Sequence, residues 1–271
     1  MRRVTTAIVS TVVYQSYRTR GVPLWIARCL RTVRRWAERR GHAYELVDDA
    51  LFDEVPGWYR DKVDGDKVIM SDLGRLHHAR RLLAEHQRVI WVDADIVVFD
   101  EDRFRTEVDE SYAVCREAWL SRTVEGQLSF FSRVNNMVLV FDRGNPFLDF
   151  YQHACESIVR RAPGPVGRLD VGTRFLTVLH HAAPLPLLTS VALLSPLLMQ
   201  DLTSGDGALT RLFMERVQEP LGAANLCASF RNTRVDGVVM EDRLFDAVVS
   251  RLVESRGEVL NGHLGGLGGE G

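Results

Sequence analysis

The first hundred residues alternate between two patterns of hydrophobic and polar positions. Residues 4–13, 43–47 and 89–92 form short runs rich in apolar and β-branched side chains, as in strands buried within a sheet. Residues 22–40 and 67–85 place apolar side chains at steps of three and four, which predicts two amphipathic helices. This strand–helix–strand–helix–strand order predicts an α/β fold with a parallel sheet and helices on its faces.

The pattern is less regular in the rest of the chain. Residues 52–66 form a polar connection, and residues 162–168 form a loop rich in Gly and Pro. The later strands and helices are predicted at 112–116, 137–141, 146–161, 171–181 and 241–255. The apolar run 185–194 fits either a strand or a buried helix segment. Six glycines in 261–271 predict a mobile end.

Composition narrows the class of protein. Of the 271 residues, 46% are hydrophobic and 26% are charged, which is typical of a folded globular chain. A net charge of −2 gives no reason to expect a nucleic acid or another polyanion as partner. No apolar stretch has the length of a transmembrane span, and no cysteine pair has zinc-site spacing. We therefore expect a cytoplasmic protein with reduced thiols.

Two acidic residues, Asp93 and Asp95, directly follow the predicted strand 89–92. Ligands bind at the carboxyl ends of strands in open α/β sheets. Two carboxylates one residue apart can face one divalent cation, and Mg²⁺ or Mn²⁺ prefers oxygen ligands and shares diphosphate oxygens. The alternative is a solvated acidic turn that merely closes the strand.

The segment 88–99 resembles the metal-binding Asp-x-Asp motif of the GT-A glycosyltransferases. The resemblance is strongest to the retaining families that include glycogenin and the fungal and plant galactosyl- and xylosyltransferases. Segments 135–141, 169–174 and 262–266 are similar to later motifs of these families, in the same order. The sequence departs from them at Val171, where many relatives have Gln.

The resemblance implies a GT-A fold, in which helices flank a Rossmann-like nucleotide-binding sheet. It implies one domain over 1–266, with a nucleotide-binding half at 1–100, an acceptor-binding half at 101–266 and a flexible tail at 267–271. The implied reaction moves a sugar from a nucleotide-diphosphate sugar, most commonly a UDP-sugar, to a glycan, natural product or protein, with retention at the sugar carbon. Mn²⁺ or Mg²⁺ would neutralise the departing diphosphate.

The same resemblance implies roles for individual residues. The metal ligands would be Asp93, Asp95 and His263. The donor would contact Thr11, Val12, Tyr14, Lys67, Asp93, Ala94 and Asn135. The catalytic residues would be Asn136 and Asp170. In an inverting enzyme Asp170 would be the general base, and in a retaining one it would position the acceptor or stabilise the cationic sugar.

Most of these side chains also have a purely structural interpretation. Asp170 is a good residue to cap a helix, and Asn135 and Asn136 could simply start a strand. Lys67 could be a solvated charge. His263 could be an ordinary residue of the chain's end.

Other classes of protein also fit part of the pattern. Asp93 to Val97 satisfies the nucleophile motif of haloacid-dehalogenase-type phosphatases, although that motif normally lies on the first strand and its acidic partner motif, near Asp206, has Thr210 where a second Asp is needed. A non-catalytic binder of nucleotide-sugars or glycans is a third possibility. A nucleotidyltransferase lacks support, because no Gly-rich loop with Lys or Arg follows the first strand.

Overall fold

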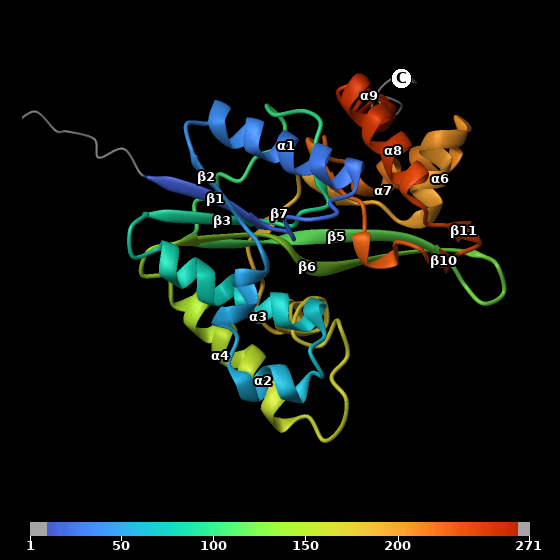
Figure 1. The fold of residues 1–271 in the computed structure, drawn as a ribbon. Coiled ribbons are helices and arrows are strands. Elements are labelled where there is room, and N and C mark those ends of the chain that lie inside the picture. The colour runs from blue at the N-terminus through green and yellow to red at the C-terminus, as the bar shows by residue number, and fades with distance from the viewer. Residues whose placement is uncertain (1–9, 265–271) are drawn as a thin grey trace, which may run out of the picture.

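The computed structural model describes residues 10–264 (Figure 1). A six-stranded sheet of order β2-β1-β3-β6-β5-β7 forms its centre. Figure 1 shows α1 and the helices α6 to α9 on one face of this sheet, and α2, α3 and α4 on the other. The predicted α/β class is thereby confirmed as a mixed sheet between two layers of helices. The predicted tail, 267–271, lies outside the described residues.

The βαβ pattern of the first hundred residues is confirmed. Strands β1 (Thr11–Ser16), β2 (Ala43–Val47) and β3 (Arg88–Val92) are parallel, with β1 between the other two. They are connected through α1 (Leu24–Arg39) and α3 (Lys67–Leu82). The first strand was placed too early. It continues to Ser16, and the part of the prediction before residue 10 lies outside the described residues.

The strands predicted at 112–116 and 137–141 belong to one long hairpin and lie at its open end, away from the turn. It consists of β5 (Tyr112–Arg122) and β6 (Leu128–Asp142), and β6 pairs antiparallel with β3. The prediction stopped short because polar residues interrupt the apolar run. Asn135 and Asn136 therefore lie inside β6, and the prediction of a turn before the strand was wrong.

Three predicted helices of the second half are present within two residues of their expected bounds. They are α4 (Pro146–Arg161), α5 (Thr173–Ala182) and α8 (Asp242–Glu254). Asn145 caps α4, because its Oδ1 accepts from the backbone N–H groups of Phe147 and Leu148.

Several elements were not predicted. The connection 52–66 contains the end of a 3₁₀ turn, η1 (Asp49–Glu54), and the short helix α2 (Gly57–Lys62). The ambiguous run 185–194 contains β7 (Leu187–Leu188) and β8 (Val191–Leu193). The remaining new elements are β4 (Ile96–Val98), α6 (Pro196–Ser204), α7 (Ala208–Val217), β9 (Ala223–Asn225), η2 (Ala228–Phe230), β10 (Arg234–Val235), β11 (Val238–Val239) and α9 (Glu258–Asn261).

A second, three-stranded sheet has the order β4-β9-β8. In it Ile96 pairs with Asn225, so the chain directly after Asp95 lies against a segment from near the carboxyl end. This pairing matters for the site described below.

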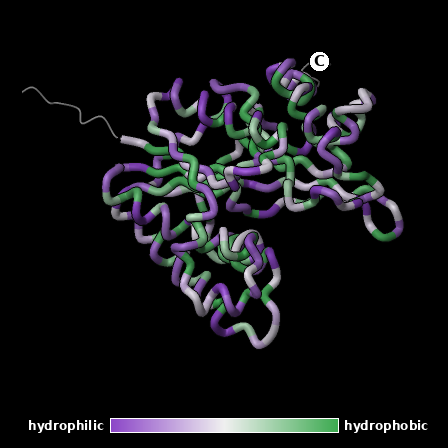
Figure 2. The backbone as a smooth tube through the Cα atoms, viewed as in Figure 1, coloured by the Kyte–Doolittle hydropathy of each residue, from purple (hydrophilic) through white to green (hydrophobic). Residues whose placement is uncertain are grey.

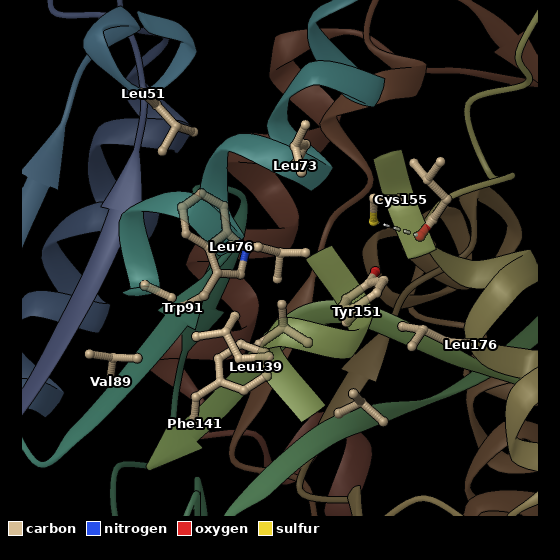
Figure 3. Packing of buried hydrophobic residues seen from close by; sticks show 14 of the residues in the cluster. Leu51, Leu73, Leu76, Val89, Trp91, Leu139, Phe141, Tyr151, Cys155 and Leu176 are labelled. Atoms are coloured by element: carbon tan, nitrogen blue, oxygen red, sulfur yellow. Dashed lines mark hydrogen bonds between the residues drawn. The ribbon is translucent and has the colours of Figure 1, made fainter. Parts of the chain in front are cut away.

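Hydrophobic packing on both faces holds the main sheet. Figure 2 shows hydrophobic residues along the central strands and hydrophilic ones mostly at the periphery. On the α3 side, Leu73, Leu76 and Trp91 pack with Phe141 and Tyr151 (Figure 3). Within residues 10–264, no helix has both the length and the apolar character that crossing a membrane requires.

Candidate active site

A cavity of about 690 Å³ opens where β1 and β3 end. Its volume lies in the range of small-molecule binding sites. Its walls come from distant segments, which include residues 16–18 at the end of β1, the helix α3, the turn 93–95, the β5–β6 hairpin and residues 225–232. This is the edge of the sheet at which α/β proteins bind ligands.

Asp93 follows the last residue of β3 and lines the cavity. Its Oδ1 accepts hydrogen bonds from Trp91 Nε1 over 2.7 Å and from Arg75 Nη1 over 3.2 Å. Its Oδ2 has a long contact of 3.5 Å with Asn225 Nδ2. One oxygen of Asp93 is therefore held firmly, and the other keeps most of its capacity to bind.

Asp95 is buried and also lines the cavity. Asn225 Nδ2 donates to its Oδ1 over 2.8 Å, and the backbone N–H of Ala228 donates to its Oδ2 over 2.7 Å. Burial, and after it the Asp93 carboxylate, raises the pKa of Asp95 to about 7. Burial also raises the pKa of Asp93, although Arg75 opposes the rise. Negative charge here is only partly compensated by the protein.

The aspartates fit a divalent cation. Each carboxylate oxygen has two lone pairs, and the hydrogen bonds above leave part of them available. Among residues 10–264, no group of three or more His, Cys, Asp or Glu side chains is arranged to hold a metal ion. Mg²⁺ is commonly bound by one or two carboxylates together with substrate phosphates and water, and Asp93 with Asp95 supplies that minimum.

Arg75 is a buried cation from α3 and lies at the centre of the polar floor. Its guanidinium donates to Asp93, to the carbonyl oxygen of Asn136 over 2.9 Å and to Ser71, and it pairs with Asp72 over 3.0 Å. It also lies over the Trp91 ring, 4.7 Å from the centroid. These contacts fix the guanidinium and, through it, the orientation of Asp93.

Asp72 lies one helical turn before Arg75 and lines the same cavity. Its Oδ1 accepts from Asn136 Nδ2 over 2.8 Å. A Cβ atom on Gly172 would lie only 3.0 Å from Asn136 Nδ2 and 3.1 Å from Asp72 Oδ2. Glycine at this position therefore allows the backbone before α5 to approach the pair closely.

Asp72 gives the ligand-free protein a pH-dependent stability. Burial raises the pKa of Asp72 to about 6, while Arg75 and Asn136 oppose the rise. The folded state keeps this proton where the unfolded state has lost it, so the free energy of unfolding falls as pH rises from about 4 to about 6. The fall is about 3 kcal/mol. Urea denaturation of wild type and Asp72→Asn across this range measures it, and parallel curves for the two proteins would contradict it.

Glu117 of β5 is a further buried carboxylate in the cavity wall. Its Oε1 accepts from Arg133 Nη2 over 2.6 Å, and its Oε2 accepts from Asn135 Nδ2 over 2.7 Å. Asn135 Oδ1 in turn accepts from the backbone N–H of Met137. The two strands of the hairpin thus hold a preformed polar group against the cavity.

Aromatic rings and cations line other parts of the cavity. Tyr17 follows β1, and Trp119 of the hairpin lies 6.1 Å from Phe230, measured between ring centroids. Lys67 lies at the start of α3, where its Nζ donates to Asp49 Oδ1 over 3.0 Å. Planar and apolar ligand groups can pack on these rings.

The predicted site residues fall into two sets. Those that line the cavity are Lys67, Asp93, Ala94, Asp95, Asn135 and Asn136. Those that the structure does not bring to the cavity are Thr11, Val12, Tyr14, Asp170 and His263.

The prediction chose a tyrosine that lies inside β1 instead of the one that follows it. Thr11, Val12 and Tyr14 all lie within β1 and are buried. The Tyr14 hydroxyl donates to the carbonyl oxygen of Arg75, and its ring stacks on His78. Its ring therefore cannot stack on a ligand. Of the two tyrosines, only Tyr17, beyond the end of β1, lines the cavity.

Asp170 and His263 also lie elsewhere. Asp170 accepts from the backbone N–H of Gly167 and from Arg174 Nη1, so it organises the loop before α5. His263 follows α9, and a Cβ atom on Gly207 would lie 3.9 Å from its Nε2. The structure does not bring His263 to the aspartates, and Gly266 of the same predicted motif lies outside the described residues.

The polar residues of the cavity that sequence reasoning missed include Asp72, Arg75, Glu117 and Asn225. Asp72 and Arg75 had a detectable signal, because they interrupt the inward face of an otherwise amphipathic helix. Asn225 had none, since its role depends on the pairing of β9 with β4.

The geometry does not favour the phosphatase alternative. Thr210 donates to Asp201 and lies outside the cavity lining, as does Asp206.

No protein-family model matches the chain, and no curated protein matches it significantly in sequence. Similar solved structures include a glycosyltransferase involved in the glycosylation of the major capsid of PBCV-1, at 11% identity and a TM-score of 0.45 over 80% of this chain and 94% of that one. Mouse xyloside xylosyltransferase 1 has 12% identity and a TM-score of 0.42 over 81% of this chain and 98% of that one. The galactosyltransferase LgtC, solved with donor and acceptor sugar analogues, has 11% identity and a TM-score of 0.44 over 89% of this chain and 95% of that one. At these values the similarity concerns the general course of the chain and says nothing of the site's chemistry.

Proposed function

We propose that the chain is a glycosyltransferase that moves a sugar from a nucleotide-diphosphate sugar with the help of Mn²⁺ or Mg²⁺. The observation that carries this proposal is the pair Asp93 and Asp95, which present two partly compensated carboxylates at the edge of a nucleotide-sized cavity. When bound, the cation neutralises charge on the departing diphosphate. Asp93 and Asp95 would hold it.

The neighbouring residues suit the rest of a donor. Tyr17, beyond the end of β1, offers a ring for the nucleobase. Asp72 Oδ2 and Asn136 Oδ1 offer acceptors for sugar hydroxyls, while Asn136 Nδ2 donates to Asp72 and Tyr151. Arg75 holds Asp93 in place, and its fixed position means that little reorganisation accompanies donor binding.

The acceptor would enter beside the hairpin. Trp119 and Phe230 form an aromatic surface on which the apolar face of a sugar ring can pack, and Glu117 can accept from a hydroxyl. We propose transfer with retention, as in the families that segment 88–99 resembles. Asp170 bonds Arg174 and Gly167 outside the cavity lining, so we propose neither the inverting nor the retaining role for it.

Nucleotide binding tests this proposal directly. We expect nucleoside diphosphates, above all UDP, to raise the thermal midpoint only when Mn²⁺ or Mg²⁺ is present. A ligand at one hundred times its Kd stabilises the folded state by about 2.7 kcal/mol. Differential scanning fluorimetry with and without EDTA measures the shift, and mass spectrometry detects slow hydrolysis of the matching nucleotide-sugar. A cation-independent shift, or none with any nucleoside diphosphate, would contradict the proposal.

A further inference from the structure

Asn225 occupies a special position beside the two aspartates. It ends β9, is 4% exposed and lines the cavity. Its Nδ2 donates to Asp95 Oδ1 over 2.8 Å and lies 3.5 Å from Asp93 Oδ2. Asn225 could act on a bound cation in two ways. Its amide oxygen could ligate the cation, or its amide N–H could position the carboxylates that ligate it.

The orientation of the amide decides between these options. Asn225 Oδ1 accepts from the backbone N–H of Cys227 over 2.8 Å, which closes an Asx-type turn. Reversing the amide would bring Nδ2 against this N–H and leave a buried donor without an acceptor, which is unfavourable. It would also remove the bond to Asp95. The local backbone therefore keeps the amide N–H, and not the oxygen, toward the aspartates.

We infer that Asn225 positions Asp93 and Asp95 without ligating the cation, so that the cation is held by these two carboxylates and by the oxygens of the diphosphate. This inference rests on the proposed function. Two protein ligands alone make a weak site for a hard cation, which otherwise keeps its water. The cation and the diphosphate therefore bind together, and each strengthens the binding of the other by the same factor.

Manganese EPR tests this coupling without any measurement of activity. The signal of free Mn²⁺ is followed on titration into the whole protein alone, into the protein with UDP, and into UDP without protein. We expect weak binding of Mn²⁺ to the protein alone. With UDP we expect the affinity to rise at least tenfold beyond what UDP alone gives.

Asn225→Asp is the sharpest variant, because it keeps the size of the side chain. One carboxylate oxygen can still accept from Cys227, while the other replaces the amide N–H with a third anionic ligand. We expect the affinity of the protein alone for Mn²⁺ to rise at least tenfold and the dependence on UDP to fall. Asn232→Asp, the same change at another residue of the cavity lining, is the matched control, with a rise below threefold expected.

Asn225→Ala is the second variant, since it removes the amide without adding charge. We expect Mn²⁺ binding in the presence of UDP to weaken about tenfold. Tight Mn²⁺ binding by the wild type without UDP, unchanged affinity in both Asn225 variants, or equal effects of Asn225→Asp and Asn232→Asp would overturn the inference. In each of these cases cation-dependent UDP binding would persist, whereas its complete absence would overturn the proposed function itself.

Discussion

Replacement of Asp95 by asparagine is expected to lower the rate of sugar transfer by about a hundredfold to a thousandfold. The Asp95 carboxylate accepts from Asn225 and from the backbone N–H of Ala228, and asparagine would set its own amide N–H against one of these donors. The variant also loses one of the two charges proposed to hold the cation. Removal of a preorganised electrostatic group at a reacting centre commonly costs two to three orders of magnitude.

Steady-state kinetics measure this loss, with the nucleotide-sugar that the binding and hydrolysis experiments identify. Asp170→Asn is the informative companion, because sequence reasoning gave Asp170 a catalytic role and the structure places it outside the cavity lining. We expect less than a threefold change for Asp170→Asn. A larger loss for Asp170→Asn than for Asp95→Asn would show that the site has been assigned to the wrong carboxylates.

Arg75→Met is expected to reduce the free energy of unfolding by about 3–5 kcal/mol. Arg75 pairs with both Asp72 and Asp93, and methionine would leave these buried carboxylates without their cation. Breaking a buried ion pair by removal of one partner has a cost of this size. Lowering the pH should recover part of the loss, because protonation removes the uncompensated charge.

Urea denaturation at two pH values measures this effect. Arg34→Met, at an exposed arginine that pairs with Glu38, is the matched control and should change stability by less than about 1 kcal/mol. Should Arg75→Met fail to fold, Arg75→Lys provides the second measurement, because lysine keeps the charge and loses most of the directed hydrogen bonds. A stability of Arg75→Lys equal to that of wild type would contradict the role given to the guanidinium.

Periodicity predicted the parts of the fold that local sequence determines. Strands β2 and β3 and the helix α4 lie within one residue of their predicted bounds, because their apolar spacing and their caps act over a few residues. The position of Asp93 and Asp95 at the rim of the sheet followed from the same alternation, since the end of a parallel strand is a local property.

The remaining parts of the site depend on tertiary pairing. Polar residues such as Glu117 and Asn135 interrupt the apolar run of the hairpin, and nothing local shows that they pair with each other across two strands. Tyr14 and Tyr17 are equally aromatic, and only the true end of β1 distinguishes the buried ring from the one at the cavity. Asn225 was not predicted for the same reason, because the pairing of β9 with β4 cannot be read from the spacing of residues.

The pairing of Ile96 with Asn225 determines when the surroundings of Asp95 are completed during synthesis of the chain. A ribosome makes Asp93 and Asp95 long before it makes Asn225 and Ala228, whose N–H groups hold Asp95. A nascent chain that ends before β9 therefore has its central βαβ core but an unfinished acidic rim. Asp95 therefore obtains these two hydrogen-bond donors only after β9 and the residues that follow it have been made.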